Sequence, residues 1–530
     1  MLKYLKYITY LIKKTKKNKK LKMPKKEKES LSERTAKNSI FNFVGNLVSK
    51  FGGLVFTIIL ARLLLPEAFG IYNLVLSIVM VFLTFTNLGV GGTIVRYMSE
   101  SIGNNNRKKA RSYFRYLIKF RAMLLALVAL AIALSSKLMA THIFQKPQMV
   151  LPLVFSSIYI LSRPLFGTSK SLFQSLNNFR NVAYMQIIFY TSRILIVLGA
   201  IYLVTSSFLV SAVFLAMALT SIICGVFGYF FLKGNRDLIF GEVEKIDTKR
   251  ILSYLGYVSL IAVSLKFFGN IDTLMLGRFV DPQFIGYYNA ALNLVAGAAG
   301  LFGFGAVLLP AFTRINKERF KRGFQKTLRY VLMLSIPSLV GAVIIGRYFI
   351  FAIYGSSYLP ATTPFYCLAA LILISPLISF YTSLLKSKER PKAVFKAVLF
   401  SLILNVFLNY FLIRYFLSFS QELAILGAAL ATVISRGIYL LVMTKKTNNL
   451  LNLKANKGPF LRATLASLVM AIFLILFTSL LDMNLFLGIL EIVFGAGIYF
   501  SFLWLIGGLK KEDWDLFSKI FIKKIKSFKK

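Results

Sequence analysis

Fourteen apolar runs, each about twenty residues long, decide what this chain can fold into. A helix of that length crosses the hydrocarbon core of a bilayer, where every backbone polar group must be satisfied internally. The chain is 57% hydrophobic with a mean hydropathy of +0.69, which excludes an ordinary soluble globule. We therefore predict an all-α, polytopic membrane protein with about fourteen transmembrane helices. The predicted spans are residues 39–61, 71–93, 115–136, 150–170, 182–204, 207–232, 252–276, 285–309, 328–350, 361–385, 394–414, 424–444, 461–481 and 485–507.

The distribution of positive charge predicts the orientation of these spans. The net charge is +46, and of the 65 Lys and Arg residues 14 lie in residues 1–37 and 8 in residues 510–530. With the N-terminus inside, the inner loops carry 32 more and the outer loops only 6. By the positive-inside rule both termini are expected in the cytoplasm, and the charge is not read as a nucleic-acid-binding surface. The first 20 residues, in which apolar side chains alternate with lysines, fit either a helix on anionic membrane lipid or a disordered tail.

An internal repeat divides the chain into two related halves. Arg62, Pro66, Gly70, Tyr72 and Asn73 recur 216 residues later as Arg278, Pro282, Gly286, Tyr288 and Asn289. A second match, at an offset of 212, relates Pro164, Ser171, Leu172 and Ser175 to Pro376, Ser383, Leu384 and Ser387. Six helices per half give both halves the same orientation, which predicts two pseudo-symmetric six-helix lobes plus two C-terminal helices, an architecture typical of transporters. The expected divisions are a basic N-terminal segment (1–37), an N-lobe (38–232), an inter-lobe loop (233–250), a C-lobe (251–446), helices 13 and 14 (447–509) and a basic tail (510–530).

Five cations fall inside the predicted spans when residues near the span ends are counted with the loops, and two of the five are placed by the repeat. Lys50 and Lys266 lie 216 residues apart, each near the middle of an apolar segment. A charge at mid-membrane costs about 2.5 kcal/mol or more, so it usually faces a cavity or a partner. We therefore predict a central chamber that holds an anion, lined also by polar side chains one helical turn away. The predicted substrate-binding residues are Lys50, Lys266, Asn46, Asn270, Arg163, Arg193 and Arg436; for the asparagines, packing between helices is the alternative.

Only two acids share that depth, Asp272 and Glu491. Asp272 breaks the repeat, because its counterpart is Phe56. It is either a group that couples transport to H⁺ or Na⁺ or a counter-ion for Lys266 or Arg278. Glu491 is the second candidate for coupling. The chain lacks a phosphate-binding G-x-x-x-x-G-K-[ST] loop, and His142 is its only histidine, so neither ATP hydrolysis nor a histidine-based metal site is expected. No cofactor and no catalytic residue is predicted.

The segments Ala61–Asn73 and Ile271–Gly277, the latter running on into Gly286-Tyr287-Tyr288-Asn289-Ala290-Ala291, resemble the polysaccharide-biosynthesis flippases of the multidrug/oligosaccharidyl-lipid/polysaccharide exporter superfamily. The resemblance extends over residues 35–510. It implies fourteen helices, two lobes in a V, a cationic central cavity, and movement of a lipid-linked oligosaccharide between leaflets.

The expected function is translocation of a polyprenyl-pyrophosphate oligosaccharide by alternating access in the plasma membrane, with the pathway's glycosyltransferases or polymerase as further partners. Three rival functions remain. A cation-coupled multidrug exporter would favour an acidic cavity, and a membrane-embedded glycan polymerase or ligase would need larger outer loops. A scaffold would act through its basic tails.

Overall fold

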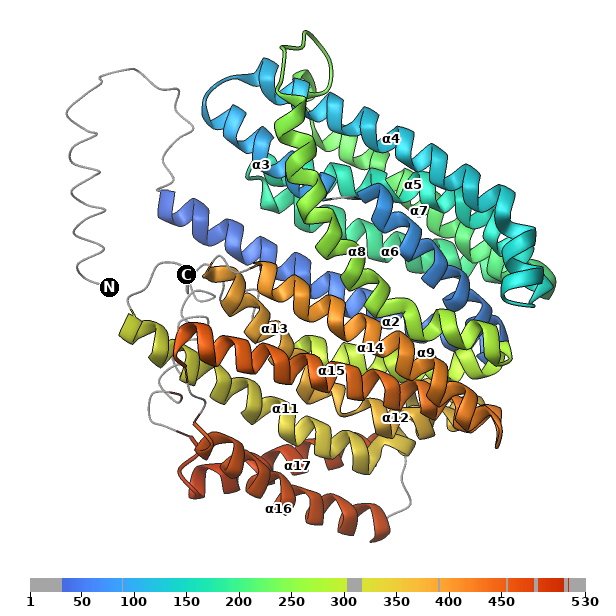
Figure 1. Ribbon diagram of the computed structural model, residues 1–530, viewed down its shortest axis with the longest axis vertical. Helices are drawn as coiled ribbons and strands as arrows, with labels where there is room; N and C mark the ends of the chain where they lie inside the picture. The colour runs from blue at the N-terminus through green and yellow to red at the C-terminus, as the bar shows by residue number, and fades with distance from the viewer. Residues whose placement is uncertain are drawn as a thin grey trace.

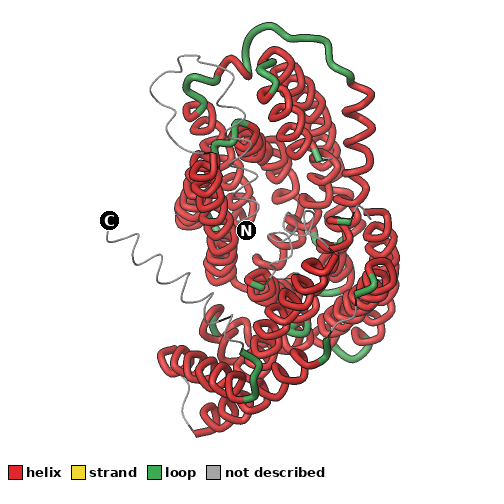
Figure 2. The backbone as a smooth tube through the Cα atoms, turned by 90° about the vertical axis from the view of Figure 1, so that its left-hand side faces the viewer, coloured by secondary structure: helices red, strands yellow, loops and turns green. Residues whose placement is uncertain are grey.

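The computed structural model describes residues 31–87, 89–302, 317–388, 391–453, 456–480 and 485–509, together with Asp513. Regular structure in these residues is entirely helical (Figures 1 and 2). The longer helices are α2 (Leu31–Asn87), α3 (Val90–Gly103), α4 (Arg107–Leu138), α5 (Val150–Ser175), α6 (Phe179–Leu203), α7 (Leu209–Phe231), α8 (Thr248–Phe279), α9 (Pro282–Leu301), α11 (Lys317–Tyr354), α12 (Thr362–Leu368), α13 (Leu371–Ser387), α14 (Pro391–Leu417), α15 (Gln421–Leu451), α16 (Gly458–Leu480) and α17 (Leu485–Leu505). The prediction of an all-helical chain is confirmed.

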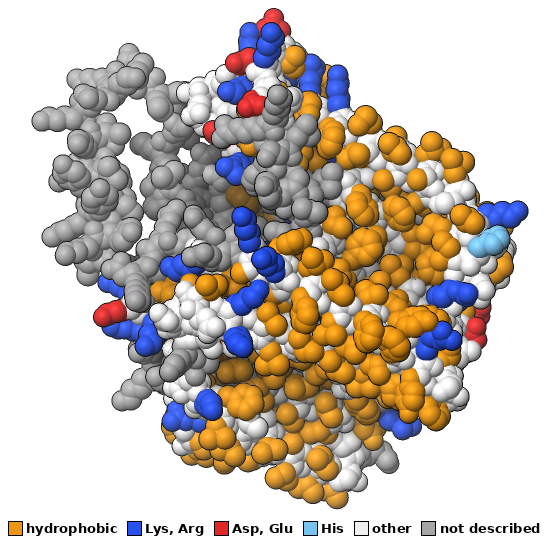
Figure 3. Space-filling view, in the orientation of Figure 1, with side chains coloured by type: hydrophobic (Ala, Val, Ile, Leu, Met, Phe, Trp, Pro, Cys, Tyr) orange, Lys and Arg blue, Asp and Glu red, His pale blue; other side chains and the backbone are white. Residues whose placement is uncertain are grey.

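The helices have the length and surface of membrane-spanning segments. Within the described residues, nine helical segments are long and apolar enough to cross a membrane, or ten if α12 and α13 form one bent span. The predicted spans that became α8, α9 and α17 are helical as well, but they fall outside that set. Figure 3 shows a broad band of hydrophobic side chains, with Lys and Arg gathered toward its two edges. Such a band is expected for a surface that faces lipid.

The predicted boundary between the first two spans is a kink, and two predicted spans have internal breaks that apolarity could not reveal. The first two spans form a single element, α2, which is kinked at Leu65, where φ is 59° and Pro66 follows. The second span ends at Asn87, and Gly89 in a left-handed conformation starts α3, which carries the chain on to Gly103. The span predicted at 361–385 is two helices, α12 and α13, bent by 47°. Residues 1–30 and most of the basic tail, along with residues 303–309 of one predicted span, lie outside the described residues.

Packing joins the two sequence halves along α2. One buried cluster is formed by α3–α7 together with the start of α8, and another by α8, α11, α13, α14 and α15. A larger cluster includes side chains of α2, α7, α9, α12 and α15 and crosses between the halves. Helices α16 and α17 pack on α11 through a small cluster around Met333, Met470 and Tyr499. In Figure 1 they form the lower edge of the molecule.

One end of the bundle, which we call the closed end, is held by contacts between equivalent parts of the repeat. Gly70 lies directly against the Pro282 carbonyl group and Gly286 directly against that of Pro66. Nearby, Arg62 donates hydrogen bonds to the carbonyl oxygens of Ala352 and Ile353, and the Tyr358 hydroxyl donates one to Ala61, 2.8 Å away. These residues lie around the kink of α2, at the start of α9, and at or just after the end of α11. The sequence halves therefore meet at this end through backbone contacts that only glycine permits.

At the other end of the bundle, the loop between α7 and α8 is attached to the first turns of α4. Arg111 donates hydrogen bonds to the carbonyl oxygens of Asp237 and Glu242, and Arg115 donates to those of Ile239 and Gly241. The Lys108 ammonium lies 2.6 Å from the Glu242 carboxylate and lowers the pKa of that carboxyl group below its usual value. The start of α4 thus lies beside the loop acids Asp237, Glu242 and Glu244. Its five cationic residues are Arg107, Lys108, Lys109, Arg111 and Arg115. These contacts attach the loop to α4, in the first half of the chain.

Candidate functional site

Lys50 faces a cavity of about 360 Å³ between α2, α9, α13 and α15. Its Nζ donates a hydrogen bond to the Gly300 carbonyl oxygen, 2.8 Å away in the last turn of α9. Backbone carbonyl groups at a helix C-terminus lack partners within the helix and carry partial negative charge, so they suit a cation. The bond joins one half of the chain to the other. Lys50 has no carboxylate partner among the described residues.

Arg436 of α15 lines the same cavity, and no acid does so among the described residues. Its guanidinium lies 5.5 Å from the ring centre of Phe268, and its Nε is buried with no hydrogen-bond acceptor among the residues that the structure describes. The remaining wall is small, hydroxylated or apolar, and includes Ser375 and Ser379 of α13. An anion with several oxygens would satisfy both the lysine and the planar arginine fork. The predicted residues Lys50 and Arg436 are thus brought together by the fold.

Lys266 belongs to a second group of cations. It is exposed, does not line the cavity of Lys50, and is close enough to Arg163 of α5 for their charges to repel each other. Arg163 stacks on Phe166 and Phe189, with its guanidinium 5.3 and 5.0 Å from the two ring centres. It also repels Lys170 and Arg121 electrostatically. Lys50 and Lys266, which we predicted to line one chamber, therefore belong to two different cationic groups.

Sequence reasoning missed Arg121, which is 5% exposed in the middle of α4. Its guanidinium donates hydrogen bonds to Thr168 on α5 and to Asn87 at the end of α2, and its Nε has no acceptor among the described residues. Its position within the predicted span 115–136 was an available signal.

The two predicted asparagines do not line the cavity of Lys50. Asn46 is exposed one turn before Lys50. Asn270 donates its side-chain amide to the carbonyl oxygen of Lys266 in its own helix, 2.7 Å away. Neither observation assigns these residues to a substrate, and the first leaves Asn46 available for contact from solvent or lipid.

Asp272 lies at the centre of a buried polar network in the second half of the chain. Its Oδ1 accepts hydrogen bonds from Asn409 at 2.8 Å and from Asn405 at 3.3 Å, and its Oδ2 accepts one from Tyr288 at 3.1 Å. Asp272 is only 2% exposed, and both asparagines are fully buried. No cation pairs with its carboxylate among the described residues. Within the part of the chain that the structure describes, the side-chain oxygens of Asn405 and Asn409 are buried without hydrogen-bond partners, and Thr432 lies beside Tyr288.

The first half of the chain fills the equivalent place with its own cation. The offset of 216 relates Asp272 to Phe56 and Tyr288 to Tyr72, and the offset of 212 relates Asn405 to Arg193. The Arg193 guanidinium lies 3.8 Å from the ring centre of Phe56 and 3.5 Å from the Tyr72 hydroxyl. Arg193 thus supplies a positive charge where the other half holds only a carboxylate and amides. The Asp272 carboxylate, by contrast, has no cation in ion-pair contact among the described residues, although Arg436 is close enough to act on Tyr288 electrostatically.

Glu491 of α17 is fully buried away from both cationic groups. Its Oε1 accepts a hydrogen bond from Thr478 of α16 at 2.8 Å, and its Oε2 is buried without a partner among the described residues. These contacts connect α16 with α17 and do not extend to the cavity of Lys50.

Comparison with known proteins gives a family match over half of the chain. The family described as polysaccharide biosynthesis protein matches residues 35–316. The "Uncharacterized membrane protein MJ1375" of Methanocaldococcus jannaschii is 24% identical over 53% of this chain and 68% of its own length. The "Probable flippase AglR" of Haloferax volcanii is 25% identical over 61% of this chain and 65% of its own length.

A solved structure matches the fold at greater extent. The structure described as "Lipid II flippase MurJ, inward closed conformation" superposes with a TM-score of 0.71, covering 92% of this chain and 99% of its own. The identity is 16%, so the likeness concerns the fold alone.

Proposed function

Because the chain belongs to the polysaccharide biosynthesis protein family, we propose that it is a flippase for a lipid-linked oligosaccharide. The substrate class is a glycan joined to a polyprenyl lipid through a pyrophosphate. The observation that carries the proposal is the cavity that holds Lys50 and Arg436 without an acid among the described residues. Two cations in a low-dielectric site favour a polyanion, and they disfavour the cationic drugs that an acidic cavity would attract.

The substrate's pyrophosphate displaces a contact that Lys50 makes in the substrate-free chain. Lys50 donates to Gly300 in this state. A phosphate oxygen is a better acceptor than a neutral carbonyl group, because charge-assisted hydrogen bonds are about twice as strong. Breaking the Lys50–Gly300 bond also removes a connection between the two halves. Lys50 thus couples binding of the pyrophosphate to loss of a contact between the two halves of the chain.

Alternating access requires two lobes that move relative to each other. The proposed lobes are residues 38–232 and 251–446, with the loop 233–250 between them and both termini in the cytoplasm of a plasma-membrane protein. The closed end then faces outward, and the pyrophosphate enters from the cytoplasmic side. The second group of cations, Arg163 and Lys266, attracts the substrate toward the cavity.

The Asp272 network is the proposed site of coupling to Na⁺ or H⁺. A buried carboxylate without a cation is expected either to bind one or to take up a proton. Oxygen ligands from Asp272, Asn405, Asn409 and Thr432 suit a hard monovalent ion. The network also adjoins the cavity, because Ser435 accepts a hydrogen bond from Asn405 and Arg436 follows it directly in α15.

The proposal is tested by changing Lys50 and Lys266 to Gln and measuring surface glycan in the source organism at matched protein level. A strong loss of glycan export is expected. The matched control changes Lys137 and Lys233, two exposed lysines outside the cavity, to Gln and should leave export intact. Normal export by the Lys50/Lys266 variant would remove the proposed mechanism.

A further inference from the structure

A second cavity, of about 640 Å³, lies among α11, α16 and the end of α17. Five cationic side chains line it: Lys321, Arg322, Lys326, Arg329 and Arg462. No carboxylate lines it among the described residues, and it shares no residue with the cavity of Lys50. We propose that this basic pocket binds the phosphate of an anionic membrane phospholipid.

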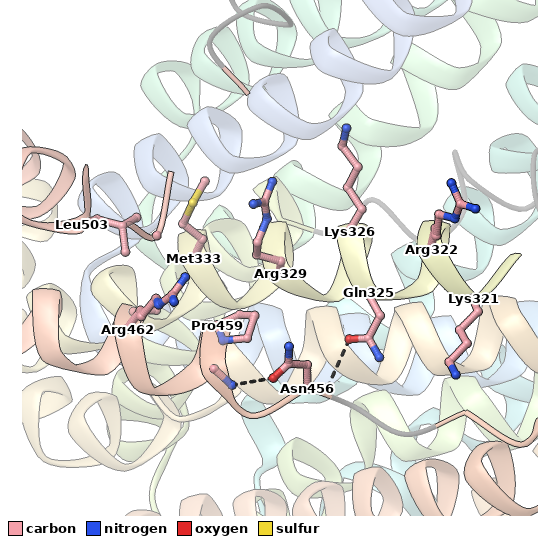
Figure 4. Close-up of a pocket in the computed structure, with 13 residues that line it drawn as sticks. Lys321, Arg322, Gln325, Lys326, Arg329, Met333, Asn456, Pro459, Arg462 and Leu503 are labelled. Carbon is pink, nitrogen blue, oxygen red and sulfur yellow. Dashed lines mark hydrogen bonds between the residues drawn. The ribbon is translucent and has the colours of Figure 1, made fainter. Parts of the chain in front are cut away.

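Helical spacing explains how three of these cations converge. Arg322, Lys326 and Arg329 are four and three residues apart on α11, so they share one face of the helix. Figure 4 shows their side chains projecting to the same side of α11. On a soluble helix such a cationic stripe would be a solvated face. Here it borders a cavity whose other walls come from two different helices.

Arg329 provides the observation that points to a ligand. Its side chain is 11% exposed, and its Nη2 lies 2.5 Å from the carboxylate of Asp513. The same oxygen of Asp513 accepts a hydrogen bond from Tyr330. The Nε and Nη1 of Arg329 are buried without an acceptor among the described residues. One carboxylate therefore leaves part of the guanidinium fork unsatisfied, and a phosphate oxygen would complete it.

The opposite wall supplies a helix N-terminus. α16 begins at Gly458, and Gly458 and Pro459 both line the cavity. Asn456 orders this turn through two hydrogen bonds. Its side-chain oxygen accepts one from the backbone amide of Gly458 at 2.9 Å, and its backbone amide donates one to the side-chain oxygen of Gln325 on α11 at 3.1 Å. The start of a long helix favours an anion. It reinforces the arginine and lysine side chains that already line the cavity.

The apolar part of the lining identifies the ligand as a lipid rather than a soluble phosphate. Met333, Ala463 and Leu503 line the same cavity beside the cations. Arg462 donates to the Gly507 carbonyl oxygen at 2.7 Å, next to Leu503, so polar and apolar walls meet there. A charged head beside an acyl chain matches this division. The pocket lies where α11 and α16 begin and α17 ends, at the end of the bundle away from the closed end.

The test uses the purified full chain and 1-palmitoyl-2-oleoyl-phosphatidylglycerol as the probe, with native mass spectrometry as the readout. The pocket variant carries Lys321→Gln, Lys326→Gln and Arg462→Gln, which leaves the Arg329–Asp513 pair in place. We expect roughly tenfold weaker retention of the lipid or more, because each cation near an anionic lipid contributes measurably. The control variant carries Lys233→Gln, Lys245→Gln and Lys392→Gln, three exposed lysines outside the pocket, and should retain the lipid like the unmodified chain.

Three results would overturn the proposal. Phosphatidylcholine could be retained as well as phosphatidylglycerol, or the pocket and control variants could lose the lipid equally. Inorganic phosphate could compete fully at equal concentration, which would assign the pocket to a soluble anion. The readout needs no transport, so it can succeed or fail independently of the proposed flippase activity.

Discussion

Gly70 and Gly286 occupy equivalent positions in the internal repeat, and each lies against the proline carbonyl group of the other copy. A Cβ on Gly70 would overlap the Pro282 oxygen, and a Cβ on Gly286 would overlap the Pro66 oxygen. The repeated motif thus packs against itself across the interface of α2 and α9. Its glycines have a steric reason that neither copy reveals alone.

Changing Gly286 to Ala is expected to loosen the closed end. Overpacking against backbone typically costs about 1–3 kcal/mol, and the helices must separate to relieve it. The measurement is thiol labelling of Ala61→Cys, a fully buried position beside the contact, in a Cys224→Ser/Cys367→Ser background. Labelling should become roughly tenfold faster, given 1.4 kcal/mol per factor of ten. Gly92→Ala is the control, because nothing lies within 4 Å of its added carbon; equal labelling in both variants would contradict the packing account.

Replacing Asp272 by Asn should abolish stabilisation by a coupling cation while keeping the fold. The side chains are nearly the same size, and the asparagine removes the only carboxylate of the network. A cation at one hundred times its dissociation constant stabilises by about 2.7 kcal/mol. Thermal unfolding of the purified chain is compared with and without NaCl, with choline chloride as the ionic-strength control, and across pH for protons. Glu491→Gln should keep the response of the unmodified chain; a response that persists in Asp272→Asn would place the coupling ion elsewhere.

The attachment of the α7–α8 loop predicts a local effect of Arg111. Two hydrogen bonds from its guanidinium hold the carbonyl groups of Asp237 and Glu242. Hydrogen bonds to charged groups are worth about 1.5–3 kcal/mol, so Arg111→Gln should accelerate amide hydrogen exchange in residues 237–243 by roughly tenfold or more. Lys119→Gln, farther along α4, is the matched control. Unchanged exchange in Arg111→Gln would mean that the loop is held by other contacts.

The pH dependence of the same loop follows from Glu242. Lys108 lowers the pKa of its carboxyl group, first through the hydrogen bond and then through its charge. A lowered carboxyl pKa contributes stability above the ordinary value, about 4.3, and this stability is lost as pH falls through the lowered value. Protection of the loop should therefore not change between pH 7 and 5 and should fall in more acidic solution. Glu242→Gln should show no such fall, and a loss already complete above pH 5 would contradict the ion pair.

Apolar length was sufficient to predict the helices, because each transmembrane helix must satisfy its own backbone. The boundary predicted between residues 61 and 71 contains the kink at Leu65. The break at Gly89 could not be predicted, because it depends on the backbone conformation of a single residue. The repeat gives Lys50 and Lys266 equivalent positions along their helices, but only Lys50 lines the cavity. An equivalent position along a helix does not fix the direction in which the side chain points. The partner of Lys50 is the backbone of Gly300, which carries no side-chain signal. The network of Asp272 needed α14, whose Asn405 and Asn409 read as ordinary polar residues in an apolar helix.

The central claim is tested most directly by reconstituting the purified chain into liposomes with a fluorescent polyprenyl-pyrophosphate oligosaccharide and following quenching of the outer-leaflet probe. The account predicts that the unmodified chain moves the lipid between leaflets, and that Lys50→Gln combined with Arg436→Gln slows this movement strongly, while Lys137→Gln combined with Lys233→Gln does not. Equal rates for the cavity variant and the unmodified chain, both above protein-free liposomes, would contradict the claim that these two cations bind the pyrophosphate.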